Sequence, residues 1–167
     1  MHLRLSFHRT GKNLEIYCDA DFAGSSDGKS VTGVILFLAD GAVGWTCQKQ
    51  TSVATSTAQT EYNAMSEAIS ELDWLSDFFK DINFSDYLRH PVKIFADNQC
   101  AISNSESDRI TKQNKHSKAK VSRVREAVSQ GLARFVFVNS TENKADFLTK
   151  VLSGPRNAEA IAAIGLV

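Results

Sequence analysis

The 167-residue sequence contains few of the residues that mark several large protein classes. Two prolines and nine glycines exclude a collagen-like chain or a proline-rich linker. Three scattered cysteines, Cys18, Cys47 and Cys100, do not suit a disulfide framework or a zinc knuckle, so we expect free thiols in a reducing compartment. No apolar run approaches the roughly 20 residues of a membrane-spanning helix, and the N-terminal residues lack the apolar core of a secretion signal. These absences predict an intracellular domain without membrane attachment.

Several short catalytic motifs are also missing. The sequence has no G-x-S-x-G, no glycine-rich phosphate loop and no H-E-x-x-H, which gives no support to serine hydrolases, P-loop enzymes or zinc proteases. A hydrophobic fraction of 43% and a charged fraction of 23% are typical of a soluble globular protein. The length favours one domain.

The charged residues are balanced in number but separated along the chain. There are 19 basic and 19 acidic residues. Residues 109–125 carry only basic charges, whereas residues 61–86 carry acidic charges against a single lysine, Lys80. A basic face can bind phosphates by counterion release even when the total charge is zero. A solvated helix face is the alternative, and the charge pattern alone leaves both open.

The hydrophobic pattern predicts an α/β fold with a mixed sheet. Residues 14–19 alternate as a half-buried strand does, and the Asp40-Gly41 turn signal separates two further strands, at 31–38 and 42–48. Ser56 with Gln59 forms a capping box that begins an amphipathic helix running to about residue 81. The remaining predicted elements are a strand at 92–96, a short helix at 98–104, a helix through 121–128, a strand at 132–138 and a last helix at 142–152. This order predicts helices packed on the faces of the sheet.

Four acidic residues stand where packing does not explain them. Asp19 closes the first strand, Asp97 ends the fourth, Glu61 lies at the edge of an apolar helix face, and Asp146 begins the last helix. Any one of them alone is explained as a cap or a surface acid. Brought together, such carboxylates repel one another, and hard divalent cations such as Mg²⁺ relieve that repulsion. Two such ions support hydrolysis of a phosphodiester.

The motifs resemble, in order, those of a known family. The sequence is similar to the ribonuclease H domain of the reverse transcriptase in copia-type LTR-retrotransposon Pol polyproteins, on the segments YCDADFAG, SVTGVILFL, GAVGWTCQKQ, TSVATSTAQTEYNAMSEAISELDWL, IFADNQCAI, NKHSKAKVSRVRE and FVNSTENKADFLTKVL. The resemblance covers residues 14–152. Residues 1–13 resemble the connection that precedes this domain, and residues 153–167 resemble the C-terminal tail of the polyprotein.

The resemblance implies a ribonuclease H-like fold and a metal site. The expected sheet has five strands, three antiparallel and then two parallel additions, with helices on both faces. The family's metal-binding quartet maps onto Asp19, Glu61, Asp97 and Asp146, which would hold two Mg²⁺ ions, with Mn²⁺ as a substitute. Asp21 competes with Asp19 for the first position, because both lie on the same strand face.

The resemblance also implies contacts with substrate. Residues beside the second and third carboxylates contact the hybrid in this family, and the basic segment would grip its backbone, which together gives Thr57, Gln99, Lys115, His116, Lys118 and Arg123. Gln99 can recognise a 2′-hydroxyl, the group that distinguishes RNA from DNA. Cellular ribonucleases H carry a histidine in the loop before the last helix, but here that loop reads NSTEN, so we assign no protein general acid.

The implied function is metal-dependent cleavage of the RNA strand of RNA–DNA hybrids during retrotransposon reverse transcription. A hybrid-binding module of the same fold with little or no cleavage is the alternative, and a DNA-cutting integrase or resolvase is a third. The expected partners are the hybrid and the polymerase domain of a parent polyprotein, and we expect a monomer when the domain is isolated. The expected location is the cytoplasm, a virus-like particle or the nucleus.

Overall fold

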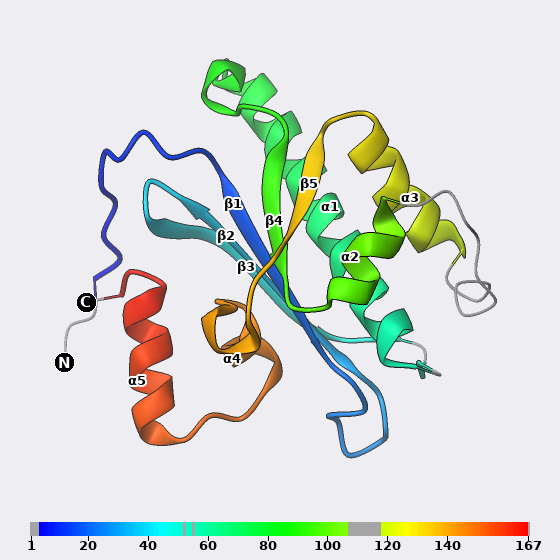
Figure 1. Ribbon diagram of the computed structural model, residues 1–167. Coiled ribbons are helices and arrows are strands. Elements are labelled where there is room, and N and C mark those ends of the chain that lie inside the picture. The colour runs from blue at the N-terminus through cyan, green and yellow to red at the C-terminus, as the bar shows by residue number, and fades with distance from the viewer. Residues whose placement is uncertain (1–3, 52, 55, 107–117, 167) are drawn as a thin grey trace.

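A computed structural model describes residues 4–51, 53–54, 56–106 and 118–166, which build one mixed sheet (Figure 1). Its strand order is β3-β2-β1-β4-β5. The first three strands pair antiparallel, whereas β4 pairs parallel with β1 and β5 pairs parallel with β4. The strands are β1 (Glu15–Asp21), β2 (Val31–Leu38), β3 (Gly41–Lys49), β4 (Val92–Ala96) and β5 (Ala133–Phe137). The predicted five-stranded mixed sheet is confirmed.

Helices lie on both faces of the sheet, as predicted. The long helix α1 packs with α3 against one face, and α4 lies against the other (Figure 1). The helices are α1 (Thr57–Asp81), α2 (Gln99–Ser105), α3 (Lys118–Ser129), α4 (Asp146–Thr149) and α5 (Gly154–Ala163), with short 3-10 turns η1 (Ser85–Tyr87) and η3 (Ser140–Glu142). In the part of the chain that the structure describes, no helix has the length and apolar character needed to cross a membrane.

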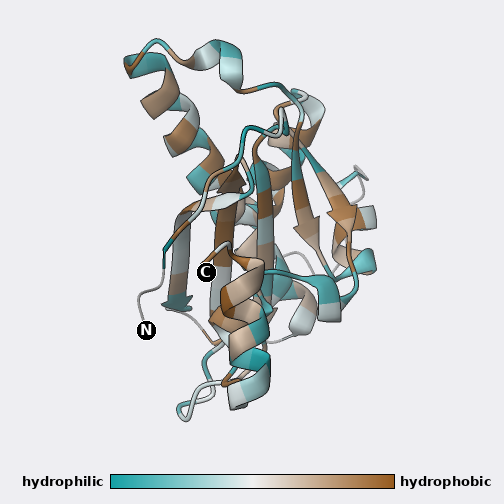
Figure 2. Cartoon of the chain, turned by 90° about the vertical axis from the view of Figure 1, so that its left-hand side faces the viewer, coloured by the Kyte–Doolittle hydropathy of each residue, from teal (hydrophilic) through white to brown (hydrophobic). Residues whose placement is uncertain are grey.

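Strand β1 is buried on both sides, which corrects the prediction of a half-buried strand. Leu14 and Ile16 face a large core shared with α1 and α3. Tyr17, on the opposite face, joins a smaller core with Phe37 and Ala145. The strand therefore contributes to two hydrophobic layers, and Figure 2 shows hydrophobic residues along the central strands. The second layer exists because the segment around α4 folds back over the sheet.

A glycine in β2 lets α4 lie directly on the sheet. Gly33 pairs with Asp19 of β1. A Cβ atom on Gly33 would lie 2.8 Å from Cβ of Leu148, 3.0 Å from Cγ2 of Thr149 and 3.1 Å from the carbonyl oxygen of Ala145. Real Cβ atoms do not approach carbon that closely, so a side chain at this position would displace α4. The close approach brings the residues of α4 next to Asp19.

The β2–β3 turn lies one residue earlier than the sequence predicted. The central turn residues are Ala39 and Asp40, with φ of 53° and 62°, rather than Asp40 and Gly41. Positive φ at both central residues is the geometry of a tight hairpin turn. Gly41 serves a different purpose, because a Cβ there would lie 2.6 Å from the ring of Phe7. The N-terminal segment thus packs against the start of β3.

The N-terminal and C-terminal segments contact each other. The amide of Ser6 donates a hydrogen bond to the carbonyl oxygen of Gly165 at 3.1 Å, and Leu5 forms an isolated β-bridge with Leu166. The amide of His8 donates to the carbonyl oxygen of Ala39 at 2.7 Å, which ties the arm to the hairpin turn. The division into an arm at 1–13, a domain at 14–152 and a tail at 153–167 stays a prediction.

The predicted last helix at 142–152 is wrong in extent. The chain instead forms the turn η3, an irregular stretch and the four-residue α4, and a separate helix α5 follows in the tail. The side chain of Asn143 explains the interruption. Its amide donates to the carbonyl oxygen of Cys18 at 3.0 Å, and its own oxygen accepts from the amide of Ala145 at 3.1 Å. These bonds anchor the loop to β1, and the backbone of Asn143 is extended, with φ of −71° and ψ of 107°, so the chain is not helical at this residue.

Candidate active site

The four acids predicted as metal ligands lie near one end of the sheet. Parallel pairing places Tyr17 of β1 opposite Phe95 of β4. Asp19 follows Tyr17 by two residues, and Asp97 follows Phe95 by two residues. Parallel strands end at the same sheet edge, so these two carboxylates are neighbours. Glu61 comes from the second turn of α1 and Asp146 from the first residue of α4. Asp19 is 2% exposed, Glu61 is 6% exposed, and the side chain of Asp146 is 16% exposed.

The carboxylates act on one another electrostatically. Burial raises the pKa of Glu61 to about 8, and the negative charges of Asp97 and then Asp19 add to the increase. Burial also raises the pKa of Asp19, with Asp97 and Asp146 contributing, against a hydrogen bond from Thr149 and the charge of Lys150. Each of the four acids therefore takes part in at least one such repulsive interaction. Without a cation this group of charges is unfavourable.

Three polar side chains contact three of the four acids, and sequence reasoning missed all of them. The hydroxyl of Thr149 donates a hydrogen bond to Oδ2 of Asp19, and the hydroxyl of Ser140 donates to Oδ2 of Asp97. The ammonium group of Lys150 pairs with Oδ1 of Asp146 and lies 4.0 Å from Oδ2 of Asp19. The i, i+4 spacing of Asp146 and Lys150 was visible in the sequence and typical of an ion pair.

The donor chemistry of the site suits a hard divalent cation. Four carboxylates offer the oxygen ligands that Mg²⁺ prefers. Within the described ranges, however, no group of three or more His, Cys, Asp or Glu side chains is arranged so that it could hold a metal ion. Lys150 supplies the positive charge in this arrangement. The assignment of the four acids as metal ligands stays a prediction.

The structure distinguishes Asp19 from Asp21. Asp19 lies among the acids, as its interactions with Asp97 and Asp146 indicate. Asp21 is the last residue of β1, and its Oδ2 fills the space beside Gly24 in the following turn. The structure therefore favours Asp19 as the member of the cluster.

Thr57 and Gln99 begin the helices next to the acids. Thr57 is the first residue of α1, after Ser56, whose hydroxyl accepts a hydrogen bond from the amide of Gln59 at 3.3 Å. This confirms the predicted N-cap. Gln99 is the first residue of α2, two positions after Asp97. Both residues are exposed, and they lie four residues before Glu61 and two residues after Asp97 in the chain.

The predicted basic residues differ in how far they are free to contact a substrate. Lys118 is exposed at the start of α3. Arg123 instead pairs with Asp73 of α1 at 2.8 Å, so part of the basic segment serves the packing of α3 on α1. Lys115 and His116 lie outside the described residues.

Comparisons with known proteins agree with this architecture. The Retrovirus-related Pol polyprotein from transposon TNT 1-94 of Nicotiana tabacum is 33% identical over 154 residues, which are 92% of this chain and 11% of that protein. RNase H1 from Halobacterium salinarum matches with a TM-score of 0.59 at 20% identity, covering 83% of this chain and 95% of that one. LC11-RNase H1, solved in complex with an RNA/DNA hybrid, matches with a TM-score of 0.57 at 17% identity, covering 82% and 94%. No family model matches the chain.

The chain is a ribonuclease H-fold domain related to copia-type Pol polyproteins. It spans about a tenth of the length of those polyproteins.

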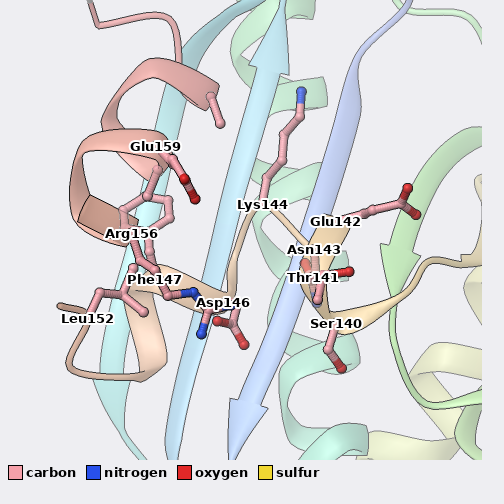
Figure 3. A pocket seen from close by; sticks show the side chains of 12 residues that line it. Ser140, Thr141, Glu142, Asn143, Lys144, Asp146, Phe147, Leu152, Arg156 and Glu159 are labelled. Carbon is pink, nitrogen blue, oxygen red and sulfur yellow. The ribbon is translucent and has the colours of Figure 1, made fainter. Parts of the chain in front are cut away.

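In this ribonuclease H-fold domain, a pocket of about 240 Å³ adjoins Asp146 (Figure 3). Its walls come from the loop around η3 and from α5, which contributes Arg156 and Glu159. Lys144 lines the same pocket, but its ammonium group lies over the rings of Tyr17 and Phe37, 5.2 and 4.4 Å from their centroids. Sequence reasoning missed Arg156, because nothing local marks a tail residue as a neighbour of Asp146.

Proposed function

We propose that this domain is a metal-dependent endoribonuclease that cleaves the RNA strand of RNA–DNA hybrids. The observation that carries the proposal is the convergence of Asp19, Glu61, Asp97 and Asp146 at one end of the sheet, where burial and mutual repulsion raise the pKa of Glu61 to about 8. A carboxyl group whose pKa is raised by burial and by neighbouring acids is typical of functional sites. The ribonuclease H fold and the relationship to Pol polyproteins support the same activity.

In the proposed mechanism Asp19, Glu61, Asp97 and Asp146 would hold two Mg²⁺ ions, with Mn²⁺ as a substitute. When bound, such ions would supply the Lewis-acid chemistry of phosphodiester hydrolysis. The protein's own contribution is positioning: Thr149 orients Asp19, and Ser140 orients Asp97. The products would carry 3′-hydroxyl and 5′-phosphate ends.

Recognition of the hybrid would use residues around the rim of the acids. The amide of Gln99 can donate to and accept from a 2′-hydroxyl, and Thr57 lies one helical turn before Glu61. Lys118 and Arg123, with Lys115 and His116 in the preceding segment, would contact phosphates. Contacts between basic side chains and phosphates supply affinity without sequence specificity.

The proposal is tested by incubating a labelled RNA–DNA hybrid with the wild-type chain and with Asp97→Asn in the presence of Mg²⁺. The expected result is cleavage by the wild type and loss of cleavage in the variant. Asp21→Asn is the matched control, because it removes a neighbouring carboxylate that lies outside the cluster. Thermal melting of both variants checks that they fold. Equal cleavage by wild type and Asp97→Asn would overturn the proposal.

A hybrid-binding module with little cleavage is the second candidate. The observation that favours it is the pairing of Lys150 with Asp146, together with the lack of an assembled metal-holding group in the described ranges. Salt-dependent binding of the hybrid without Mg²⁺-stimulated cleavage would support this candidate over the first.

The biological setting is also a proposal. As part of a Pol polyprotein, the domain would act with a polymerase domain during reverse transcription, in the cytoplasm, in a virus-like particle or in the nucleus.

A further inference from the structure

Lys150 brings a positive charge into the acidic group. Its ammonium group pairs with Oδ1 of Asp146 and lies 4.0 Å from Oδ2 of Asp19. Two of the four acids thus share one lysine. The lysine side chain keeps 41% of its surface exposed, whereas Asp19 is almost entirely buried.

The fold leaves this lysine beside the acids. Lys150 directly follows α4, four residues after Asp146. The preceding residue, Thr149, donates its hydroxyl hydrogen to Asp19 and is buried. The backbone at 149–150 is therefore tied to β1, and the lysine side chain starts beside the carboxylates. Rotation of its exposed end into solvent requires no change in the backbone.

An ammonium group and a divalent cation compete for the same carboxylate oxygens. A lysine paired with Asp146 neutralises part of the negative charge that would attract a dication. A dication bound at the same oxygens would also repel the ammonium, because like charges a few ångströms apart interact strongly in a partly buried site. Binding a metal therefore requires the lysine to leave.

We propose that Lys150 is a resident counter-ion of the acidic site, which stabilises the domain without metal and raises the metal concentration at which the site fills. Lys150 is thus a positioning residue, acting through Asp146 and Asp19. The inference rests on the proposed function, since it takes the four carboxylates as the metal site.

The test is calorimetric titration of the chain with Mn²⁺ alone, without nucleic acid, combined with thermal melting in EDTA. The variant is Lys150→Met, which keeps an unbranched side chain of nearly the same length and removes its charge. The expected result is Mn²⁺ affinity at least about threefold tighter than wild type and a lower melting temperature in EDTA. Lys150→Arg, which keeps the charge, is expected to bind Mn²⁺ with nearly the wild-type affinity.

Lys144→Met is the matched control, because it removes a lysine from the same segment whose ammonium lies over Tyr17 and Phe37. The Lys144→Met variant is expected to bind Mn²⁺ within about twofold of the wild-type affinity. Lys150→Gln replaces Lys150→Met if the latter does not fold.

The outcomes separate the two proposals. If wild type and Lys150→Met bind Mn²⁺ equally well, or the variant binds more weakly, the counter-ion role is overturned and the metal site stands. If neither protein takes up Mn²⁺, the proposed metal site is overturned and the counter-ion role with it. Uptake by Lys150→Met at concentrations where the wild type remains empty supports both.

Discussion

The hydroxyl of Thr149 donates a hydrogen bond to Oδ2 of Asp19, a carboxylate that precedes it by 130 residues and is 2% exposed. This bond joins α4 to the central strand β1 at the acidic site. The same hydroxyl also contacts the carbonyl oxygen of Asp146 at 3.1 Å. One small side chain therefore contacts the carboxylate of one predicted ligand, Asp19, and the backbone of another, Asp146.

Replacing Thr149 with valine is expected to destabilise the fold. The substitution keeps the shape of the side chain but leaves the buried carboxylate of Asp19 without this donor, which costs about 2 kcal/mol in the free energy of unfolding. Urea denaturation at pH 8 measures the loss. Thr149→Ser retains the hydroxyl and is the control. An equal loss in both variants would assign the effect to packing rather than to the hydrogen bond.

The metal-free protein is expected to lose stability as the pH rises from about 4.5 to about 8. Over this range folded Glu61 keeps a proton, because its pKa is about 8, whereas the unfolded chain, with the ordinary value of 4.5, has released it. The folded state then binds more protons, so the free energy of unfolding falls with pH. Each unit by which the pKa differs between the folded and unfolded states corresponds to roughly 1.4 kcal/mol in the free energy of unfolding.

Glu61→Gln isolates this contribution, because glutamine does not titrate. Urea unfolding in EDTA between pH 5 and pH 9 is expected to give a shallower decrease for the variant than for the wild type. Because the pKa of Asp19 is also raised, the free energy of unfolding still falls with pH in both proteins. Parallel curves for the two proteins would contradict the raised pKa of Glu61.

Gly33→Ala is expected to displace α4 from the sheet. The new methyl group would lie 2.8 Å from Cβ of Leu148 and 3.0 Å from Cγ2 of Thr149. Overpacking of this kind costs about 1–3 kcal/mol, and moving Asp146 away from Asp19 should also reduce cleavage. Gly44→Ala is the matched control, since a Cβ there meets its nearest atom, in Leu36, at 3.7 Å. Similar stability and cleavage in the two variants would contradict the role given to the close packing at Gly33.

The elements with strong local signals were predicted well from the sequence. The strands at 31–38 and 92–96 have the predicted bounds, because runs of β-branched and aromatic residues end at clear turn or proline signals. The long helix begins at its predicted cap, Ser56, and ends at residue 81.

Features set by distant contacts were not predictable in this way. The last helix begins only at Asp146, after a loop in which Asn143 bonds to Cys18, 125 residues away, and no local pattern encodes that contact. The burial of β1 on both faces depends on where α4 packs. The predicted alternation of β1 is confirmed, because Leu14, Ile16 and Cys18 face one core and Tyr17 faces the other.

The acidic residues were recognisable one by one, but their proximity was not. Asp19 and Asp97 are neighbours because β1 and β4 pair in parallel, a relationship that hydrophobic periodicity does not contain. The expectation that the four acids lie together came from the resemblance to the ribonuclease H family. Lys150 and Ser140 were missed because their importance comes from the carboxylates they contact, Asp146 and Asp97.

The central claim is that the carboxylates of Asp19 in β1, Glu61 in α1, Asp97 just after β4 and Asp146 in α4 form one site for divalent cations. The most direct test is a crystal soaked with Mn²⁺ and measured for anomalous scattering. We predict Mn²⁺ peaks bound by oxygens of Asp19, Glu61, Asp97 and Asp146, with the ammonium of Lys150 displaced. A crystal without Mn²⁺ at these carboxylates, or with Mn²⁺ bound by Asp21 in place of Asp19, would contradict the account.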